Sequence, residues 1–327
     1  MSLLEVRDLQ VWFDLPHGGR LHAVQGMTFD VDPGERLGLV GESGCGKTTA
    51  LLALMGLLPP SAEVDGEVLI DGTEILRGGE DAMRRHRWTD VAMVFQGAMN
   101  ALNPVKTVGS QIVEPMEFHG RATGAAAKKE AGELLQLVGI PASAAGRYPH
   151  EFSGGMRQRA AIAMALACEP KVLLADEPTT ALDVMVQAQI LQLLVGLTQD
   201  FGLAVIIVTH DLPLVAQVCE RAVVMYAGRT AESGPIDGLF HDPRHPYTRL
   251  LFEATPDLLG DAEVVSIPGA PPRLDRPLVG CPFEPRCDRA FDRCKIDTPR
   301  LAVVAARHEA ACHLNELERV PMGPGDG

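Results

Sequence analysis

The stretch ERLGLVGESGCGKTTALLALMGLL, residues 35–58, joins a short apolar run, a glycine-rich turn and an apolar segment with helical spacing. Its centre fits the pattern G-x-x-x-x-G-K-[ST], whose fixed positions are Gly41, Gly46, Lys47 and Thr48. Glycines allow the backbone to point successive N–H groups, and the positive end of the following helix, at phosphate oxygens. Lys47 adds a charge for the β- and γ-phosphates, and the Thr48 hydroxyl is placed to ligate Mg²⁺. The stretch therefore predicts a P-loop that binds ATP. A dinucleotide fingerprint is excluded, because its third glycine would fall at Thr49.

Cys45 lies inside this loop, at a helix N-terminus where a thiolate is favoured. Phosphoryl transfer to water needs positioning and charge rather than a covalent partner, so we do not expect Cys45 to act as a nucleophile. We expect thiol reagents to inactivate the protein by blocking phosphate access, and bound nucleotide to protect it.

Two later segments end apolar strands with polar residues. KVLLADEP, residues 171–178, ends in the adjacent carboxylates Asp176 and Glu177. There Asp176 can hold Mg²⁺, and Glu177 can orient and polarise the attacking water. AVIIVTHDL, residues 204–212, predicts a strand that ends at Thr209 and His210. A lone histidine at such a place is usually structural, so His210 gains weight only from the other motifs.

FSGGMRQRAAIAMALACEP, residues 152–170, predicts a helix capped by Ser153 and opened by two glycines. The first backbone N–H groups of this helix form a second helix N-terminus that can bind phosphate. Alone, it would be an ordinary capped helix.

The order of these motifs resembles the ATP-binding-cassette (ABC) family: P-loop, Gln96 in MVFQ, SGG, the Asp-Glu pair, Ala181 to Asp183, and His210. The resemblance implies an α/β fold, a P-loop NTPase with a RecA-like core, an antiparallel β subdomain and an inserted helical subdomain. It makes the protein an ATPase. The implied catalytic residues are Glu177, His210, Gln96 and Lys47, and the implied Mg²⁺ contacts are Thr48, Gln96 and Asp176. The implied nucleotide-binding residues are Phe13, Gly41, Glu42, Ser43, Gly44, Cys45, Gly46, Lys47, Thr48 and Thr49.

In this family the signature faces a nucleotide on a second chain, which would place Ser153, Gly154, Gly155 and Met156 there and Asp183 at the dimer interface. Phe152 and Met156 replace the usual Leu and Gln of LSGGQ, but the backbone donors remain. Phe13 matches the aromatic residue that stacks on adenine. A core position is the alternative, because Leu9 and Val11 share its face of the strand.

The resemblance divides the chain into an ABC ATPase domain, residues 1–256, with a helical subdomain at about 97–165, and an extension, residues 257–327. Within the insertion, AAAKKEAGELLQLVG, residues 125–139, predicts a helix with Ala127, Ala131, Leu134 and Val138 on one face. ATP would then lie between two chains. Each chain offers two helix N-termini that can bind phosphate, and both can contact a nucleotide's phosphates only when two chains form a dimer.

HDPRHPYTRLLFEATP, residues 241–256, and the proline-rich tail look like the oligopeptide and dipeptide importer ATPases. This implies a peptide-import motor, peripheral on the cytoplasmic face of the membrane. The implied partners are a second, paralogous ATPase subunit rather than a copy of this chain, two transmembrane permease subunits, and indirectly an extracytoplasmic solute-binding protein. The alternatives are nickel or oligosaccharide as cargo, a non-transport ABC ATPase, and a metal-stapled binding module.

The tail contains the stretch GCPFEPRCDRAFDRCK, residues 280–295, and has too little apolar material for a core of its own. We expect its four cysteines to staple it through a metal, because disulfides are disfavoured in a reducing cytosol. Thiolates suit Zn²⁺ or an iron-sulfur cluster, and the spacing alone chooses neither. The family resemblance favours 4Fe-4S over Zn²⁺ or no metal, with His308 or His313 able to replace one thiolate. The four are Cys281, Cys287, Cys294 and Cys312.

Composition limits the other classes of function. The net charge of −14 opposes the phosphate attraction that nucleic-acid binders need. No apolar run approaches the roughly 20 residues that span a bilayer. The N-terminal stretch MSLLEVRDLQVWFD lacks the features of a signal peptide, so we expect a cytosolic protein. Cys168 and Cys219 lie in apolar stretches and are expected in the core.

Overall fold

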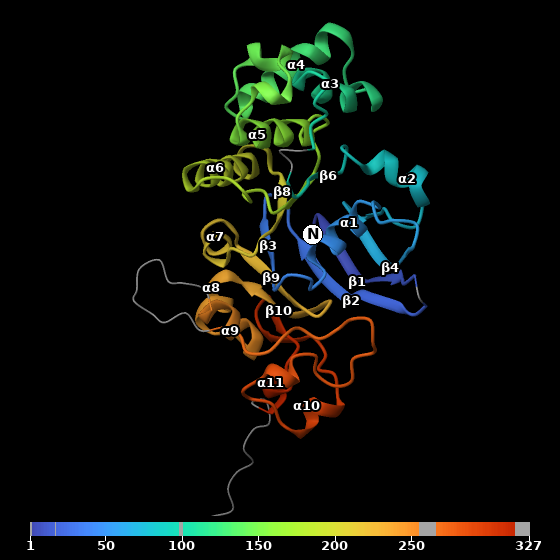
Figure 1. The fold of residues 1–327 in the computed structure, drawn as a ribbon, viewed down its shortest axis with the longest axis vertical. Helices are drawn as coiled ribbons and strands as arrows, with labels where there is room; N and C mark the ends of the chain where they lie inside the picture. Colours follow the sequence, from blue (N-terminus) through green and yellow to red (C-terminus); the bar gives the residue numbers. More distant parts are fainter. Residues whose placement is uncertain (1, 17, 98–100, 255–265, 318–327) are drawn as a thin grey trace, which may run out of the picture.

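The computed structural model describes residues 2–16, 18–97, 101–254 and 266–317 (Figure 1). A first sheet has the strand order β2-β1-β4-β5, and all of its neighbours are antiparallel. This is the antiparallel β subdomain expected from the family resemblance. Its strands are β1 (Leu4–Asp14), β2 (Arg20–Val31), β4 (Ala62–Ile70) and β5 (Thr73–Glu74).

The second sheet has the order β11-β12-β10-β9-β3-β8-β7-β6 among the described residues. Strands β9, β3, β8, β7 and β6 are parallel to one another, whereas β10, β12 and β11 join antiparallel. The buried parallel strands carry apolar residues on both faces, as the continuous apolar runs predict. The parallel strands are β3 (Arg36–Val40), β6 (Val91–Val94), β7 (Val172–Asp176), β8 (Ala204–Val208) and β9 (Arg221–Tyr226), and the antiparallel ones are β10 (Arg229–Pro235), β11 (Ala302–Ala305) and β12 (His308–Ala310).

Parallel strands end at one edge of a sheet, and there the polar motifs meet. The glycine turn follows β3, Asp176 ends β7, and Thr209 and His210 follow β8. Ligands of open α/β sheets bind at this carboxyl edge. The fold therefore brings together motifs that are far apart in the sequence.

A helical region lies at one end of the long axis in Figure 1. Its helix α4 confirms the predicted amphipathic segment, but Leu135 is fully buried while Leu134 is only partly so. The buried face of α4 is formed by residues spaced four apart, Ala127, Ala131 and Leu135. This face is therefore rotated slightly around the helix axis from the predicted one. Residues 98–100, inside the predicted helical subdomain, lie outside the described ranges. The region contains α3 (Val108–Phe118), α4 (Gly124–Leu137), α5 (Gly154–Ala165) and the short turns η2 (Ala142–Gly146) and η3 (Pro149–Glu151).

Of the other helices, α1, α6, α7, α8 and α9 contact strands of the two sheets. Cys168 and Cys219 are buried in the core, as predicted. Among the described residues, no helix is both long and apolar enough to cross a bilayer. The helices are α1 (Lys47–Leu54), α2 (Gly79–His86), α6 (Val184–Phe201), α7 (Leu212–Val218), α8 (Ile236–His241), α9 (Pro246–Glu253), α10 (Asp292–Ile296), α11 (Leu314–Leu317) and the turn η4 (Glu284–Arg286).

Residues 266–317, here called the C-terminal segment, attach to the main body in two ways. Strand β12 pairs with β10, so the segment extends the large sheet. Phe283 is 1% exposed and packs against Tyr226 and Tyr247, at ring-centroid distances of 5.1 and 5.3 Å. Strand pairing and aromatic packing therefore attach the segment to the body, so the predicted metal staple is not supported as the source of this attachment. The predicted boundary after residue 256 lies outside the described ranges.

Candidate functional site

Two glycines of the turn lie where a side chain would clash with the backbone of a neighbouring segment. Gly41 has a φ of 147°, and a Cβ there would lie 2.2 Å from the carbonyl oxygen of Met225. Gly46, the N-cap of α1, has a φ of 107°, and its Cβ would lie 2.5 Å from the carbonyl oxygen of Ala23. Neither position tolerates a side chain, so the predicted need for glycine has a direct physical reason.

Lys47 points into this turn. Its Nζ donates to the carbonyl oxygens of Gly41 at 2.7 Å and Glu42 at 3.0 Å. Lys47 as a whole is only 8% exposed, and its ammonium group is held by the loop itself. The Lys47 ammonium group therefore lies beside the backbone N–H groups that would bind a phosphate.

Asp176 has the environment of a metal ligand. It is 1% exposed, and its Oδ1 atom has no hydrogen-bond partner. Burial raises the pKa of Asp176, while a hydrogen bond from Thr48 opposes this shift. A buried, unpaired carboxylate oxygen is costly unless a cation compensates it. Asp176 and Thr48 thus fit Mg²⁺, a hard ion that prefers such oxygen ligands.

Glu177 receives hydrogen bonds from three side chains at once. Gln96 Nε2 and Thr180 Oγ1 donate to Oε2 at 2.8 and 2.9 Å, and His210 Nδ1 lies 3.2 Å from Oε1. Burial opposes ionisation, but these bonds outweigh it and lower the pKa of Glu177. The backbone at Glu177 has a φ of 46°, a strained conformation of the kind found at functional sites. Sequence reasoning missed Thr180, although its place three residues after Glu177 could have suggested it.

One cavity of about 680 Å³ is lined by five of these residues, Lys47, Thr48, Gln96, Glu177 and His210, whereas Asp176 and Thr180 do not line it. Phe13 lines the cavity and also packs, partly buried, against the core, so its contact with adenine stays a prediction. Three residues of the C-terminal segment, which the sequence did not predict, also line it: Pro271, Pro272 and Leu274. The other lining residues are Leu21, Ala23, Ser43, Gly44, Gly46, Lys47, Thr48, Thr49, Gln96, Glu177 and His210.

The SGG helix lies outside that cavity. Ser153 caps α5 as predicted, since its side chain accepts from the N–H of Met156 at 3.3 Å. A Cβ on Gly155 would lie 2.6 Å from Val186, which explains the second glycine. Asp183 caps α6 by accepting from the N–H of Val186 at 3.0 Å. Within one chain these residues have capping roles, and their place opposite a second chain's nucleotide stays a prediction.

The expectation for Cys45 requires correction. Its side chain is 5% exposed, and burial raises the pKa of the thiol despite the nearby Lys47. The helix end therefore does not produce a thiolate here, and we expect Cys45 to react slowly with thiol reagents.

The tail cysteines find only partial support as ligands. All seven cysteines are free thiols, and the N–H of Cys281 donates to the carbonyl of Cys294 at 2.7 Å. Burial, with a contribution from the other tail thiols, raises the pKa of Cys281 to about 11 and that of Cys312 to about 12. Yet no group of three or more His, Cys, Asp or Glu side chains in the described part of the chain is arranged to hold a metal ion.

The two histidines proposed as substitute ligands are engaged elsewhere. His308 Nε2 lies 2.6 Å from Glu232, and His313 Nε2 lies 2.9 Å from the carbonyl oxygen of Asp297. The metal-stapled extension is therefore not supported by the arrangement of these side chains.

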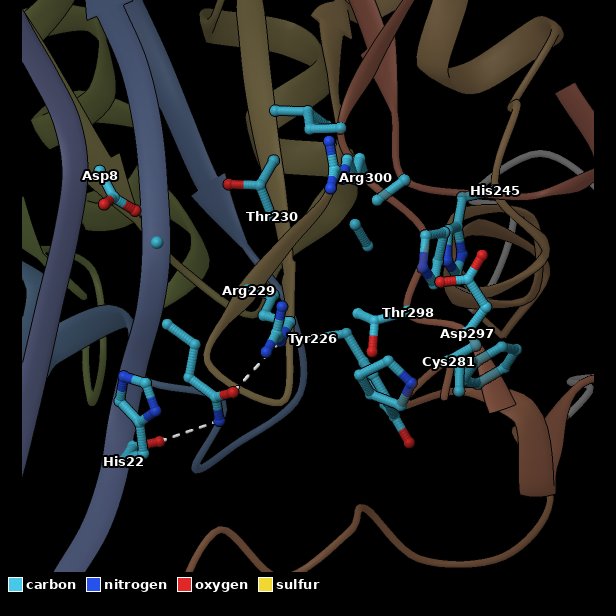
Figure 2. Close-up of a pocket in the computed structure, with 18 of the residues that line it drawn as sticks. Asp8, His22, Tyr226, Arg229, Thr230, His245, Cys281, Asp297, Thr298 and Arg300 are labelled. Carbon is cyan, nitrogen blue, oxygen red and sulfur yellow. Dashed lines mark hydrogen bonds between the residues drawn. The ribbon is translucent and has the colours of Figure 1, made fainter. Parts of the chain in front are cut away.

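A second cavity, of about 570 Å³, lies where the C-terminal segment meets the body (Figure 2). Tyr226, Arg229, His245 and Cys281 line it. It contains none of the predicted nucleotide-binding residues, so we assign the phosphate chemistry to the first cavity.

Comparison with known proteins agrees with this geometry. Residues 24–180 match the family described as ABC transporter, and residues 231–294 match the oligopeptide/dipeptide transporter C-terminal region. A probable peptide ABC transporter ATP-binding protein of Sinorhizobium fredii is 48% identical, over 95% of this chain and 94% of the relative. The chain belongs to the ABC transporter ATPases of the oligopeptide/dipeptide group.

Further relatives include the dipeptide transport ATP-binding protein DppD of Bacillus subtilis, 46% identical over 96% of this chain and 95% of that protein. OppD of Escherichia coli is 46% identical over 91% of this chain and 89% of its own length. The dimeric cassette MJ0796 bound to ADP and phosphate superposes with a TM-score of 0.63 at 29% identity, covering 71% of this chain and 98% of the cassette. This ABC ATPase therefore has the P-loop NTPase fold of cassettes that hydrolyse ATP.

Proposed function

We propose that this ATPase is the motor subunit of a peptide importer, peripheral on the cytoplasmic face of the membrane. The names of its relatives support peptides as the cargo class. The observation that carries the catalytic part is the Glu177 carboxylate, held by Gln96, Thr180 and His210 beside the cavity that contains Lys47.

The chemistry of hydrolysis is assigned to residues of this chain. Lys47 and the loop N–H groups bind the phosphates, and Mg²⁺, when bound by Thr48 and Asp176, neutralises charge on them. Glu177, kept ionised, accepts a hydrogen bond from the attacking water and orients it. Oε2 already has two donors, so Oε1 is the oxygen that meets the water when His210 turns towards the γ-phosphate.

We assign the second half of the nucleotide site to a partner chain. The signature, residues 153–156, does not line this chain's own cavity, which supports contact with a nucleotide bound elsewhere. A paralogous ATPase is the proposed partner, and ATP would join the two chains. Two transmembrane permease subunits would dock near Gln96 and the helical region, and an extracytoplasmic solute-binding protein would deliver the peptide.

The test is Glu177→Gln in the complex reconstituted with its permease subunits. Peptide uptake into vesicles should stop, while ATP stays bound. Glu253→Gln, an exposed change on α9 that breaks an ion pair with Arg249 away from the proposed permease-docking surface, is the matched control and should transport normally. Normal uptake by the Glu177 variant would contradict the proposal.

We also propose a 4Fe-4S cluster on Cys281, Cys287, Cys294 and Cys312. The support is that all four cysteines are free and that the backbone N–H of Cys281 bonds to the carbonyl oxygen of Cys294, which brings these two together. Side-chain rotation would be needed, given the arrangement described above. Anaerobic purification should give a brown protein with about four iron atoms and four sulfides. Stoichiometric zinc, or a colourless metal-free protein, would refute the cluster.

A further inference from the structure

A side chain of the C-terminal segment is built into the phosphate loop. Arg286 Nη1 and Nη2 donate to the two carboxylate oxygens of Glu42 at 2.6 and 2.9 Å. The two residues are 244 positions apart in the sequence, and Arg286 is 7% exposed. Glu42 is partly exposed, but this two-pronged pair has a fixed geometry that lysine could not reproduce.

The rest of the Arg286 guanidinium is also fixed. Nε donates to the carbonyl oxygen of Pro268 at 2.7 Å, and Nη1 also donates to the Tyr226 hydroxyl at 3.2 Å. The guanidinium carbon lies 5.7 Å from the Tyr226 ring centre and 5.9 Å from that of Phe283. A buried cation is costly unless its donors are paired, and here they are. The contact is therefore well defined and not a loose surface ion pair.

Glu42 is held at each of its other polar groups as well. Its N–H donates to the Tyr247 hydroxyl at 2.9 Å, and its carbonyl oxygen accepts from Lys47 Nζ at 3.0 Å. Arg286 thus holds Glu42, and the carbonyl oxygen of Glu42 accepts a hydrogen bond from the phosphate-binding Lys47. A shift of Glu42 would move both the loop backbone and Lys47.

The same segment reaches the other end of the nucleotide cavity. Pro271, Pro272 and Leu274 line it together with Phe13, and the carbonyl of Leu274 accepts from the N–H of His22 at 3.2 Å. On its other side Tyr226, the hydroxyl partner of Arg286, lines the second cavity beside Cys281 (Figure 2). One continuous segment therefore contacts both the phosphate loop and the far wall of the cavity.

We propose that Arg286 is a positioning residue for the phosphate loop, through which the C-terminal segment sets the affinity for nucleotide. Two physical effects act in the same direction. A loop that is already held loses less freedom when phosphate binds. Pairing also removes the repulsion that a free Glu42 carboxylate would exert on the triphosphate.

Loss of the Arg286 guanidinium should weaken nucleotide binding but leave the turnover rate nearly unchanged. Arg286→Gln should raise the Kd for a non-hydrolysable ATP analogue about tenfold, while kcat at saturating ATP stays within about twofold, because Glu177 and its donors are untouched. Glu42→Gln combined with Arg286→Gln should recover part of the lost affinity, since the second change removes the unpaired charge. Purely structural damage would not be reversed by a second substitution.

The matched control is Arg293→Gln, in the same segment. Arg293 pairs with Asp297 and Glu316, both inside the segment, so the Kd should not change. Calorimetric titration of the full chain, with thermal unfolding measured alongside, gives the comparison. Should Arg286→Gln not fold, Arg286→Lys, which keeps the cation but cannot bond both oxygens, must still raise the Kd at least threefold.

The inference rests on the proposed nucleotide site but fails separately from it. A wild-type chain that does not bind the analogue would contradict the site itself. An unchanged Kd in the folded Arg286 variants, equal weakening by Arg293→Gln, or no recovery in the double variant would overturn the positioning role alone.

Discussion

Gln96 Nε2 lies 2.8 Å from Glu177 Oε2, although the two residues are 81 positions apart. Gln96 follows β6 and precedes the helical region, whereas Glu177 follows β7, so the bond links that region to the proposed catalytic carboxylate. Any movement of the helical region that displaces Gln96 removes one donor from Glu177. The bond thus couples the position of the helical region to the orientation of the Glu177 carboxylate.

Removing the Gln96 amide should slow hydrolysis. We expect Gln96→Ala to lower kcat at least tenfold, because Glu177 loses both orientation and a donor that stabilises its charge. Steady-state ATPase assays measure this effect, with ATP binding expected to remain. Gln136→Ala, an exposed change on α4, is the control, and equal rates in the two variants would contradict the role of Gln96.

Thr180 should set the pH dependence of activity. Its hydroxyl donates to Glu177 and helps to lower the pKa of that carboxyl. In Thr180→Val the carboxylate is less stabilised, so it takes up a proton at higher pH and activity is lost earlier as the pH falls. The acidic limb of the kcat profile should therefore move upwards. Thr180→Ser should restore it, and a valine profile that matches wild type would speak against this hydrogen bond.

Gly41 should be intolerant of any side chain. A Cβ would meet the Met225 carbonyl at 2.2 Å, and the φ of 147° disfavours other residues. We expect Gly41→Ala to cost about 1–3 kcal/mol of unfolding free energy and to abolish nucleotide binding. Gly196→Ala, in the interior of α6 with open space at the Cβ position, should instead stabilise the protein by about 0.5–1 kcal/mol. Denaturant unfolding of both variants decides the matter, and similar effects would contradict the steric argument.

His245 should make the fold sensitive to acid. Complete burial lowers the pKa of His245 to about 4, against the opposing influence of Glu232. The pKa of histidine in the unfolded chain is about 6.5. Between about pH 6.5 and 4 the unfolded chain binds the proton and the folded chain does not, so the free energy of unfolding decreases as the pH is lowered through this range. The loss approaches about 1.4 kcal/mol per pH unit.

His245→Asn removes this titration but keeps an acceptor for the N–H of Tyr247, which His245 Nδ1 now receives at 3.0 Å. Denaturant unfolding between pH 7 and 5 should therefore give a flatter stability profile in the variant. Parallel profiles for the two proteins would show that His245 is not the group responsible.

Local patterns were sufficient to predict the strand ends and the phosphate loop. The apolar runs before Gly41 and Asp176 predicted buried parallel strands, and the structure places them so. Ser153 was identified as an N-cap from its place before two glycines. Each of these predictions depends on residues within one segment, where propensity and sterics act directly.

Contacts between distant segments could not be predicted in this way. Nothing near Arg286 in the sequence indicates that its partner is Glu42, and nothing near Cys45 shows that the thiol is buried. The packing of the tail against the body could not be predicted for the same reason. Its apolar residues are too few for a separate core, but Phe283 shares the core of the body, which composition alone does not reveal.

We propose that ATP joins two chains before Glu177 acts. Analytical ultracentrifugation of the Glu177→Gln variant, with and without the proposed paralogous partner, measures whether they associate. We expect a stable dimer in ATP with Mg²⁺ and dissociation in ADP. A species that remains monomeric in ATP, together with wild-type turnover per chain that does not depend on protein concentration or on the partner, would contradict the account.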